Sequence, residues 1–464
     1  MTTDEGSEAP VEETPPAVDA GEPDYPKESY AWYVVGVLML VYVISFVDRQ
    51  ILSMMVIPIR ADLEISEVQM GFLMGPGFAI FYAFFGFPLG RLADTRSRRT
   101  IIVIGLAVWS FMTAGCGIAK NYTQFLLLRI GVGVGEASLS PSAYSLITDY
   151  FRPNRLATAI SVYGAGIYIG SGMAFLLGAT VIGFASGQDM YTLPLVGEIR
   201  PWQLVFLVIG GPGLLFTAVV YTIREPIRRG MGKAGSATVD AIPMSTVLAY
   251  IRDNWKTFSC HTVGFAFLSF IAYGSAAWGI TFYARVHEWD PVRIGLVYGT
   301  IVVIFGTAGI LFGGRLADRL ALKGYTDSKM RTGLIAAVLQ LPFGAAVMLV
   351  PEAWMAFVIM IPATFFLAMP FGVAPAAIQE MMPNAMRGQA SALYLFIVNL
   401  IGLAAGPLIV AWFTQSVFKD DNMIWASLLV TGLGAGIISI VLLSLGLKHF
   451  RNSIVHRDEW HAAQ

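Results

Sequence analysis

Charge is scarce in this chain of 464 residues, and the shortage excludes several classes of protein. Only 13% of the residues are charged, against about 25% in soluble proteins, so a soluble enzyme is excluded. The two cysteines, Cys116 and Cys260, both lie in apolar runs, which excludes a disulfide scaffold. Thirty basic and 31 acidic residues leave a net charge of −1, which argues against nucleic-acid binding.

Histidine is equally sparse. The five histidines are scattered, and only His261 lies inside an apolar run, so no metal-ligand cluster is expected. The chain has no Walker-type phosphate loop and no nucleophile with an accompanying base. We therefore predict no enzyme activity, no cofactor, no metal and no ATP-driven step.

Apolar residues are abundant instead. They make up 56% of the chain, and the mean hydropathy is +0.66. A membrane-spanning helix needs about 20 apolar residues, and the pattern predicts an all-α polytopic membrane protein with 12 spans. They are 31–59, 69–92, 100–119, 123–150, 157–185, 202–224, 258–285, 292–314, 331–350, 353–382, 388–416 and 422–447.

Basic residues set the orientation. With both chain ends in the cytoplasm, 22 of the 30 lysines and arginines fall on the cytoplasmic side and six on the outside. The first span is expected to serve as the targeting signal and to remain. We predict a cytoplasmic-membrane protein whose two termini are cytoplasmic, in contact with membrane lipids and acting as a monomer.

The spans divide into two groups. The expected parts are an acidic disordered cytoplasmic tail (1–28), an N-terminal six-helix bundle (29–224), a cytoplasmic linker (225–257), a C-terminal six-helix bundle (258–448) and a cytoplasmic tail (449–464). Leu248, Ile251, Trp255 and Phe258 lie on one face of the linker's end. That pattern fits either a helix on the membrane surface or an ordinary linker helix.

An internal repeat supports the two groups. Gly90-Arg-Leu-Ala-Asp94 recurs letter for letter as Gly314-Arg-Leu-Ala-Asp318, each copy at the end of an even-numbered span. A looser echo joins the Pro153-Asn154 turn to the Pro383-Asn384 turn at a similar offset. Two parallel six-helix halves with a cavity between them are a transporter architecture.

These motifs resemble the major facilitator superfamily. Gly90-Arg-Leu-Ala-Asp-Thr-Arg-Ser-Arg-Arg99 is similar to that family's loop 2–3 signature, and Arg129-Ile-Gly-Val-Gly133 to its helix 4 motif. Within the superfamily, Phe46-Val-Asp-Arg-Gln50 and Gly135-Glu-Ala-Ser-Leu-Ser140 resemble the Spinster family. The resemblance implies alternating access and a lysophospholipid or sphingolipid-like substrate.

Charged residues inside spans are candidates for function, because each is costly in a bilayer. At about 1.5 Å per residue, Asp48 lies about 16 Å and Glu136 about 20 Å from the outer ends of their spans, near the midplane with Arg49. Arg129 lies two turns outward of Glu136. We predict that Asp48, Arg49 and Glu136 couple proton binding to substrate binding. The alternative is a static ion pair that fixes helix packing.

The C-terminal half has no comparable acid in its spans and is rich in aromatic residues. The expected secondary cavity residues are Arg129, Tyr273, Trp278, Tyr283 and Asn399. A charged half facing an apolar half suits an amphiphile with its head group near Arg49. The prediction is a proton-coupled secondary transporter of a lipid-like amphiphile. A small organic anion held by Arg49 is the alternative; a channel or an intramembrane enzyme fits less well.

The resemblance also implies a cytoplasmic gate that closes when the outside is open. It pairs Arg91 with Asp149 and Arg315 with Glu380, and it brings Asp94 near Arg387. Gly90 and Asp318 complete the expected gate, although the second motif copy lacks the full basic tail. The trailing arginines Arg96, Arg98 and Arg99 either belong to this gate or only set the topology and bind anionic lipid.

Overall fold

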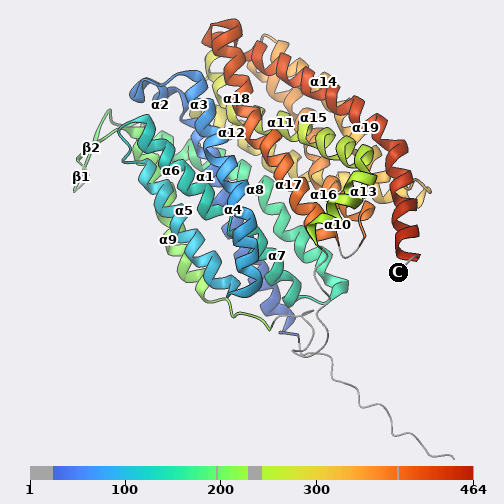
Figure 1. Cartoon of the computed structure of the whole chain (residues 1–464). Coiled ribbons are helices and arrows are strands. Elements are labelled where there is room, and N and C mark those ends of the chain that lie inside the picture. Colours follow the sequence, from blue (N-terminus) through green and yellow to red (C-terminus); the bar gives the residue numbers. More distant parts are fainter. Residues whose placement is uncertain (1–24, 195–196, 228–242, 384–385, 463–464) are drawn as a thin grey trace, which may run out of the picture.

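The computed structural model describes residues 25–194, 197–227, 243–383 and 386–462. Most of the predicted acidic tail and much of the predicted linker lie outside these residues. Figure 1 shows two groups of long helices side by side, one from each half of the chain. The start of α1 and the end of α19 lie at the same end of the bundle, which we call the termini face, and the opposite end is the far face.

The N-terminal half contains nine helices and one hairpin among the described residues. They are α1 (Glu28–Met54), α2 (Val56–Leu63), α3 (Glu67–Met74), α4 (Pro76–Thr95), α5 (Arg98–Cys116), α6 (Tyr122–Glu136), α7 (Leu139–Tyr150), α8 (Pro153–Ala185), β1 (Tyr191–Leu193), β2 (Gly197–Ile199) and α9 (Pro201–Tyr221). The antiparallel hairpin β1–β2 stands at the far face, away from the bundle (Figure 1), and the sequence had not indicated it.

The C-terminal half repeats the arrangement with more local irregularity. It contains α10 (Met244–Asp253), α11 (Trp255–Val286), α12 (Pro291–Ile301), η1 (Val302–Gly306), α13 (Thr307–Leu322), α14 (Ser328–Leu349), α15 (Ala353–Ala368), α16 (Pro370–Met381), α17 (Arg387–Val398), η3 (Asn399–Ala404), α18 (Ala405–Trp412), η4 (Phe413–Phe418), η5 (Asp421–Met423) and α19 (Ile424–Ala462). Three of these, η1, η3 and η4, are single π-helical turns inside longer rods.

Eleven helices among the described residues are long and apolar enough to cross a membrane. The predicted span 123–150 is divided into α6 and α7, so neither piece alone reaches that length. The division follows Glu136, where the Ser138 N–H bonds to the carbonyl of Gly135 and interrupts the helical ladder. Helices dominate because a bilayer core supplies no hydrogen-bond partners for an open backbone.

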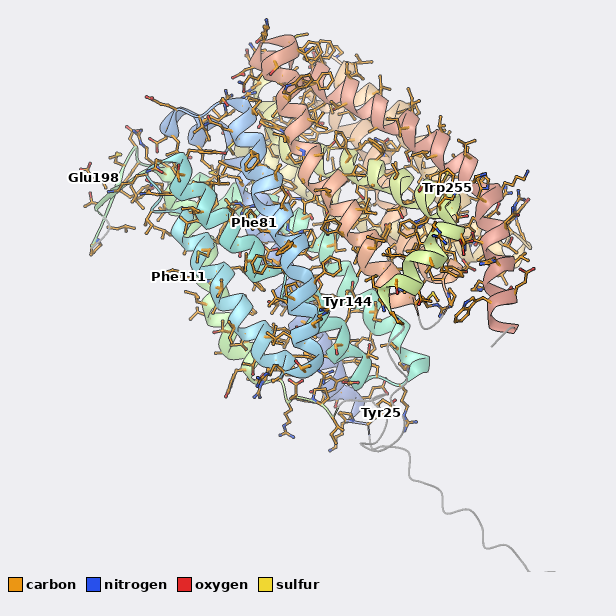
Figure 2. The ribbon with its side chains drawn as sticks, in the orientation of Figure 1. Tyr25, Phe81, Phe111, Tyr144, Glu198 and Trp255 are labelled. Carbon is orange, nitrogen blue, oxygen red and sulfur yellow. The ribbon has the colours of Figure 1, made fainter. Side chains whose placement is uncertain are left out.

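Exposed apolar side chains cover the sides of the bundle. Phe111 on α5 is 64% exposed and points outward in Figure 2, and Phe184 on α8 is 81% exposed. The apolar side of α10 is turned inward instead, because Val247, Tyr250 and Ile251 are buried in the C-terminal core. Leu248, which the sequence placed on the same apolar face as Ile251, is exposed.

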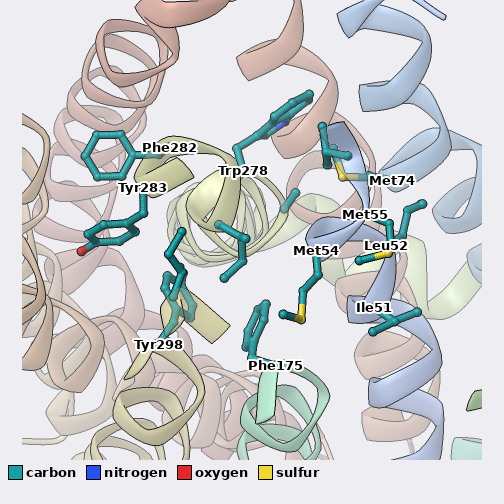
Figure 3. Close-up of a cluster of buried hydrophobic side chains, with 14 of the residues drawn as sticks. Ile51, Leu52, Met54, Met55, Met74, Phe175, Trp278, Phe282, Tyr283 and Tyr298 are labelled. Carbon is teal, nitrogen blue, oxygen red and sulfur yellow. The ribbon is translucent and has the colours of Figure 1, made fainter. Parts of the chain in front are cut away.

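The two halves share one core near the far face. Met54 and Phe175 from the N-terminal half pack with Trp278 and Tyr298 from the C-terminal half (Figure 3), and the Phe175 and Tyr298 ring centroids are 4.9 Å apart. Backbones also approach closely, since a Cβ on Gly75 would lie 2.4 Å from the carbonyl oxygen of Ala404.

Toward the termini face the cores are separate. The cluster around Tyr150 and Ile223 draws almost entirely on the N-terminal half, and the cluster around Met381 and Phe450 on the C-terminal half. The interface between the halves is therefore tightly closed at the far face and loosely packed toward the termini face.

Candidate functional site

A buried ion pair lies beside the interface between the halves. The Arg49 Nη2 donates to Glu136 Oε2 at 2.5 Å, and the Ser45 hydroxyl donates to the same oxygen at 2.6 Å. The Arg49 side chain is 7% exposed and that of Glu136 is fully buried. Glu136 is the last residue of α6, so the break before α7 positions its carboxylate against α1.

Aromatic rings surround the Arg49 cation. Its guanidinium carbon lies 4.8 Å from the Phe46 ring centroid, 4.6 Å from that of Phe78 and 5.1 Å from that of Tyr82. Such contacts stabilise a cation where water is absent. Arg49 is therefore held by a single carboxylate and by π faces.

Asp48 is fully buried next to this pair. Neither oxygen of its carboxylate has a hydrogen-bond partner in the part of the chain that the structure describes. Trp109 and Thr113 on α5 are the donors next to this carboxylate. An unpartnered carboxylate is rare in a folded protein and calls for an explanation through function.

The buried Arg129 side chain contacts the same group of residues from the far-face side. Its Nη1 donates to the backbone carbonyl of Asp48 at 3.3 Å, and its guanidinium carbon lies 5.5 Å from the Phe78 centroid. Asp48, Arg49 and Glu136 therefore occupy one layer between α1 and α6, and Arg129 borders it from the far-face side. These three are the residues that the sequence placed near the midplane.

A central cavity of about 410 Å³ lies between the halves on the termini side of this layer. Arg49, Tyr82 and Tyr144 line it from the N-terminal half, and Tyr273 and Asn399 from the C-terminal half. Figure 2 shows Tyr144 at the boundary between the two groups of helices. Arg49 thus donates to Glu136 through one nitrogen and also contributes to the wall of the cavity.

A second cavity of about 150 Å³ is lined mainly by the C-terminal half, and its lining is mostly apolar. It is lined by α11, α12, α14, α15 and α19 from the C-terminal half and by α1 and α8 from the N-terminal half, and Phe282, Tyr283 and Tyr298 contribute to its wall. Both cavities are lined by Phe46 and Tyr273, so they meet close to Arg49.

Three of the five predicted cavity residues line these spaces, namely Tyr273, Tyr283 and Asn399. Arg129 and Trp278 line neither cavity. Arg129 is enclosed between α6, α1 and Phe78, and Trp278 donates its indole N–H to the Pro407 carbonyl at 2.9 Å inside the shared core. Both lie toward the far face, where the halves are packed together.

The predicted gate pairs are different in the structure. Asp149 is bound by Arg98, not by Arg91, because the first turn of α5 packs on α7 while Arg91 is exposed. Glu380 is bound by Lys329 at 2.6 Å instead of Arg315, because the start of α14 lies beside the end of α16. Both observed pairs lie within one half.

The remaining gate residues form no contact between the halves among the described side chains. Arg315 and Asp318 are exposed, and Arg387 donates to the Met382 carbonyl at 3.4 Å. A Cβ on Gly90 would meet only Pro141, at 3.8 Å, so no close helix approach depends on this glycine. The side chain of Asp94 lies outside what the structure describes.

The ion pairs that join the halves, among the described residues, lie at the far face. Glu67 is fully buried and accepts from Arg285 at 2.7 Å, and it also pairs with Arg60. Asp421 pairs with Arg60 at 2.7 Å and lies 3.8 Å from Arg285. The sequence alone had not indicated this network, although charges at the outer ends of spans were a usable signal.

Comparison with known proteins identifies the family. Residues 38–407 match the Major Facilitator Superfamily. An MFS-type efflux pump of Mycolicibacterium smegmatis is 27% identical over 456 residues, covering 95% of this chain and 98% of the pump. Protein spinster homolog 3 of Danio rerio is 25% identical over 433 residues, covering 87% of this chain and 81% of that protein. A probable L-galactonate transporter of Escherichia coli is 27% identical over 308 residues, covering 65% of this chain and 64% of the transporter.

Solved structures agree on the fold. A bacterial homolog of the human lysosomal transporter Spinster, in an inward-facing and unoccupied conformation, superimposes with a TM-score of 0.77 at 24% identity, covering 93% of this chain and 99% of the homolog. Its occupied inward-facing form gives a TM-score of 0.72. The Spinster resemblance seen in the motifs is thus confirmed among the relatives. The chain belongs to the major facilitator superfamily and is a membrane transporter.

Proposed function

We propose that this protein is a proton-coupled secondary transporter that moves a lipid-like amphiphile by alternating access. The observation that carries the proposal is the arrangement of Arg49: its cation is paired with Glu136, adjoins the unpartnered Asp48 and borders the central cavity. A substrate anion in that cavity competes with Glu136 for the same cation.

The competition supplies the coupling. A buried carboxylate that loses its counter-charge is strongly destabilised. When a substrate anion draws Arg49 away, Glu136 keeps only the Ser45 hydroxyl, and a proton on the carboxylate removes the excess charge. Asp48 is a second acid in the same layer that can exchange that proton. Substrate binding and proton binding are thereby linked through one side chain.

The cavities favour an amphiphile. The central cavity offers Arg49 and hydroxyl groups to a polar head, and the second cavity offers an apolar wall to a chain. Because they meet at Phe46 and Tyr273, one molecule can occupy both. Burial of each CH₂ group of such a chain is worth about 0.8 kcal/mol.

A small organic anion is the second candidate. Two relatives are named for such substrates, the probable L-galactonate transporter and a hexuronate transporter of Bacillus subtilis. Arg49 at the cavity wall would bind a carboxylate equally well. The apolar second cavity has no role under this alternative, and for that reason we place it second.

We further propose that the protein acts as a monomer in the cytoplasmic membrane with both termini in the cytoplasm. The excess of basic residues on the termini side supports this orientation. The central cavity then faces the cytoplasm, and the network of Arg60, Glu67, Arg285 and Asp421 closes the outside.

Transport into proteoliposomes under an imposed pH gradient tests the proposal. A labelled lysophospholipid and a labelled hexuronate are compared in wild type, Asp48→Asn, Arg49→Ala and Glu136→Gln, with the exposed Arg155→Gln as control. We expect gradient-driven lysophospholipid flux that the three site variants lose and the control keeps. Flux of hexuronate alone would support the second candidate. Proton coupling would be overturned if the flux were the same with and without the pH gradient and the same in wild type and the three site variants.

A further inference from the structure

One buried polar group that lines the second cavity has no hydrogen-bond partner among the described residues. Gln340 on α14 is 5% exposed and lines this cavity, and its Oε1 has no hydrogen-bond partner among the described residues. It is the one described lining residue with an enclosed, unpartnered polar atom. The hydroxyls of Tyr298 and Tyr283 are already occupied, by the Ser275 carbonyl and the Met360 sulfur.

A glycine makes room for this amide. A Cβ on Gly344, one turn further along α14, would lie 2.4 Å from the Gln340 Nε2. The amide therefore folds back over Gly344, and a larger residue there would displace it. Gly432 on α19 lines the same cavity, but a Cβ on it would meet nothing within 4 Å.

Most residues that line this cavity are apolar, although Gln50, Ser171 and Thr364 also line it. Leu341, Val347, Leu428 and Leu433 line the same cavity. Burying an amide without a hydrogen-bond partner costs free energy, because its hydrogen bonds to water are lost and not replaced. A cavity that binds only a plain hydrocarbon chain would have no need for such a group. The buried amide is satisfied when a bound substrate places its own hydrogen-bond donor or acceptor next to Gln340.

We propose that Gln340, positioned by Gly344, binds a hydrogen-bonding group carried on the apolar chain of the substrate. The inference rests on the proposed function, in which Arg49 holds an anionic head and the chain enters the second cavity. This narrows the proposed substrate class to anionic amphiphiles whose apolar chain carries a hydroxyl or another hydrogen-bonding group.

Binding of synthetic alkyl phosphates tests the inference. Octadecyl phosphate is compared with hydroxyoctadecyl phosphates that carry one hydroxyl at successive chain positions, on purified wild-type protein, Gln340→Leu, Gly344→Ala and the control Gly432→Ala. We expect one positional isomer to bind wild type at least about tenfold more tightly than octadecyl phosphate, equal to about 1.4 kcal/mol. Gln340→Leu and Gly344→Ala should lose this preference, and Gly432→Ala should retain it.

Binding of plain octadecyl phosphate separates the possible failures and also reports that each variant is folded. If it binds in an Arg49-dependent manner and no isomer is preferred, or the preference survives Gln340→Leu, the inference is overturned and the proposed function stands. If no alkyl phosphate binds to wild type, both are overturned.

Discussion

Arg49 is the residue on which the site depends, because three kinds of neighbour share its cation. Glu136 supplies a charge, Phe46, Phe78 and Tyr82 supply π faces, and the cavity offers a place for an anion. A planar guanidinium can serve all three at once, whereas an ammonium is a compact point charge. The shape of the cation therefore matters as well as its sign.

Substitution Arg49→Lys tests this requirement for shape. The variant should remain folded, since a cation still faces Glu136, but transport should fall at least about tenfold because the stacked contacts and the geometry of the cavity-facing donors are lost. Substrate flux is measured together with thermal stability in detergent. Flux equal to that of wild type would show that only the charge at this position is used.

At the scale of elements, the far-face network decides which side of the transporter is closed. Glu67 at the start of α3 is fully buried between Arg60 of α2 and Arg285 of α11, and Asp421 of η5 completes the set. Removing one partner from a buried pair costs about 3–5 kcal/mol, because the opposite charges are left uncompensated. Such a loss falls only on the conformation that is closed at the far face.

Glu67→Gln should therefore shift the protein toward opening at the far face. Spin labels on cysteines introduced at the exposed positions Ala61 and Asn422 report the separation of the halves there. We expect a longer mean distance in Glu67→Gln than in the parent. Arg200→Gln is the matched control, since it breaks the Arg200–Asp62 pair of 2.6 Å on the same face but within one half. Equal distance distributions in all three would show that the network does not hold the halves together.

A second contact between elements has a predictable pH dependence. Glu225, just after α9, accepts hydrogen bonds from the Ser97 hydroxyl, the Arg98 side chain and the backbone N–H groups of Arg98 and Arg99 at the start of α5. Burial alone would raise the pKa of Glu225, but these hydrogen bonds outweigh it and hold the pKa below its usual value. The stabilisation is full above the unfolded pKa of about 4.3 and disappears as the pH falls through the lower, folded value.

Glu225→Gln should accordingly lower the apparent Tm at pH 7, by an amount that corresponds to about 1–3 kcal/mol for hydrogen bonds to a charged group. The difference from wild type should shrink as the pH is lowered through about 4, where wild type also loses the charge. Thermal unfolding in detergent across this range is the measurement. The exposed hairpin variant Glu198→Gln should match wild type throughout, and a gap that persists at low pH would contradict the assignment.

At the scale of the whole molecule, one shared core and two separate cores define the conformation. The halves are packed together around Trp278 and Phe175 near the far face, and the central cavity lies where the cores diverge. With the orientation proposed above, this is a cytoplasm-facing state.

The orientation itself predicts which positions an impermeant thiol reagent reaches in intact cells. A cysteine at Glu198 on the far-face hairpin (Figure 2) should be labelled, and one at Lys323, directly after α13, should be protected until the membrane is permeabilised. Both positions are exposed, so membrane sidedness alone separates them. The reverse pattern would invert the proposed orientation and turn the central cavity to the outside.

Much of this protein could be predicted from its sequence because a bilayer leaves few choices. Long apolar runs must become helices, the repeated Gly-Arg-Leu-Ala-Asp motif indicates two related halves, and charges inside spans are too costly to be accidental. The similar depths of Asp48, Arg49 and Glu136 placed them in one layer, and the family resemblance implied that their spans both line the cavity; the pairing of Arg49 with Glu136 is seen in the structure. These are consequences of periodicity and of depth, which a linear chain displays directly.

Only the tertiary structure decided the partners of charges that lie at helix ends. Asp149 binds Arg98 instead of Arg91, and Glu67 pairs with Arg285, more than 200 residues away. The tertiary structure also placed Arg129 and Trp278 outside both cavities. Several arginines lie within reach of each such carboxylate along the chain, so local spacing does not choose among them. The choice depends on how the halves approach and where they separate, which is set by the packing of whole helices.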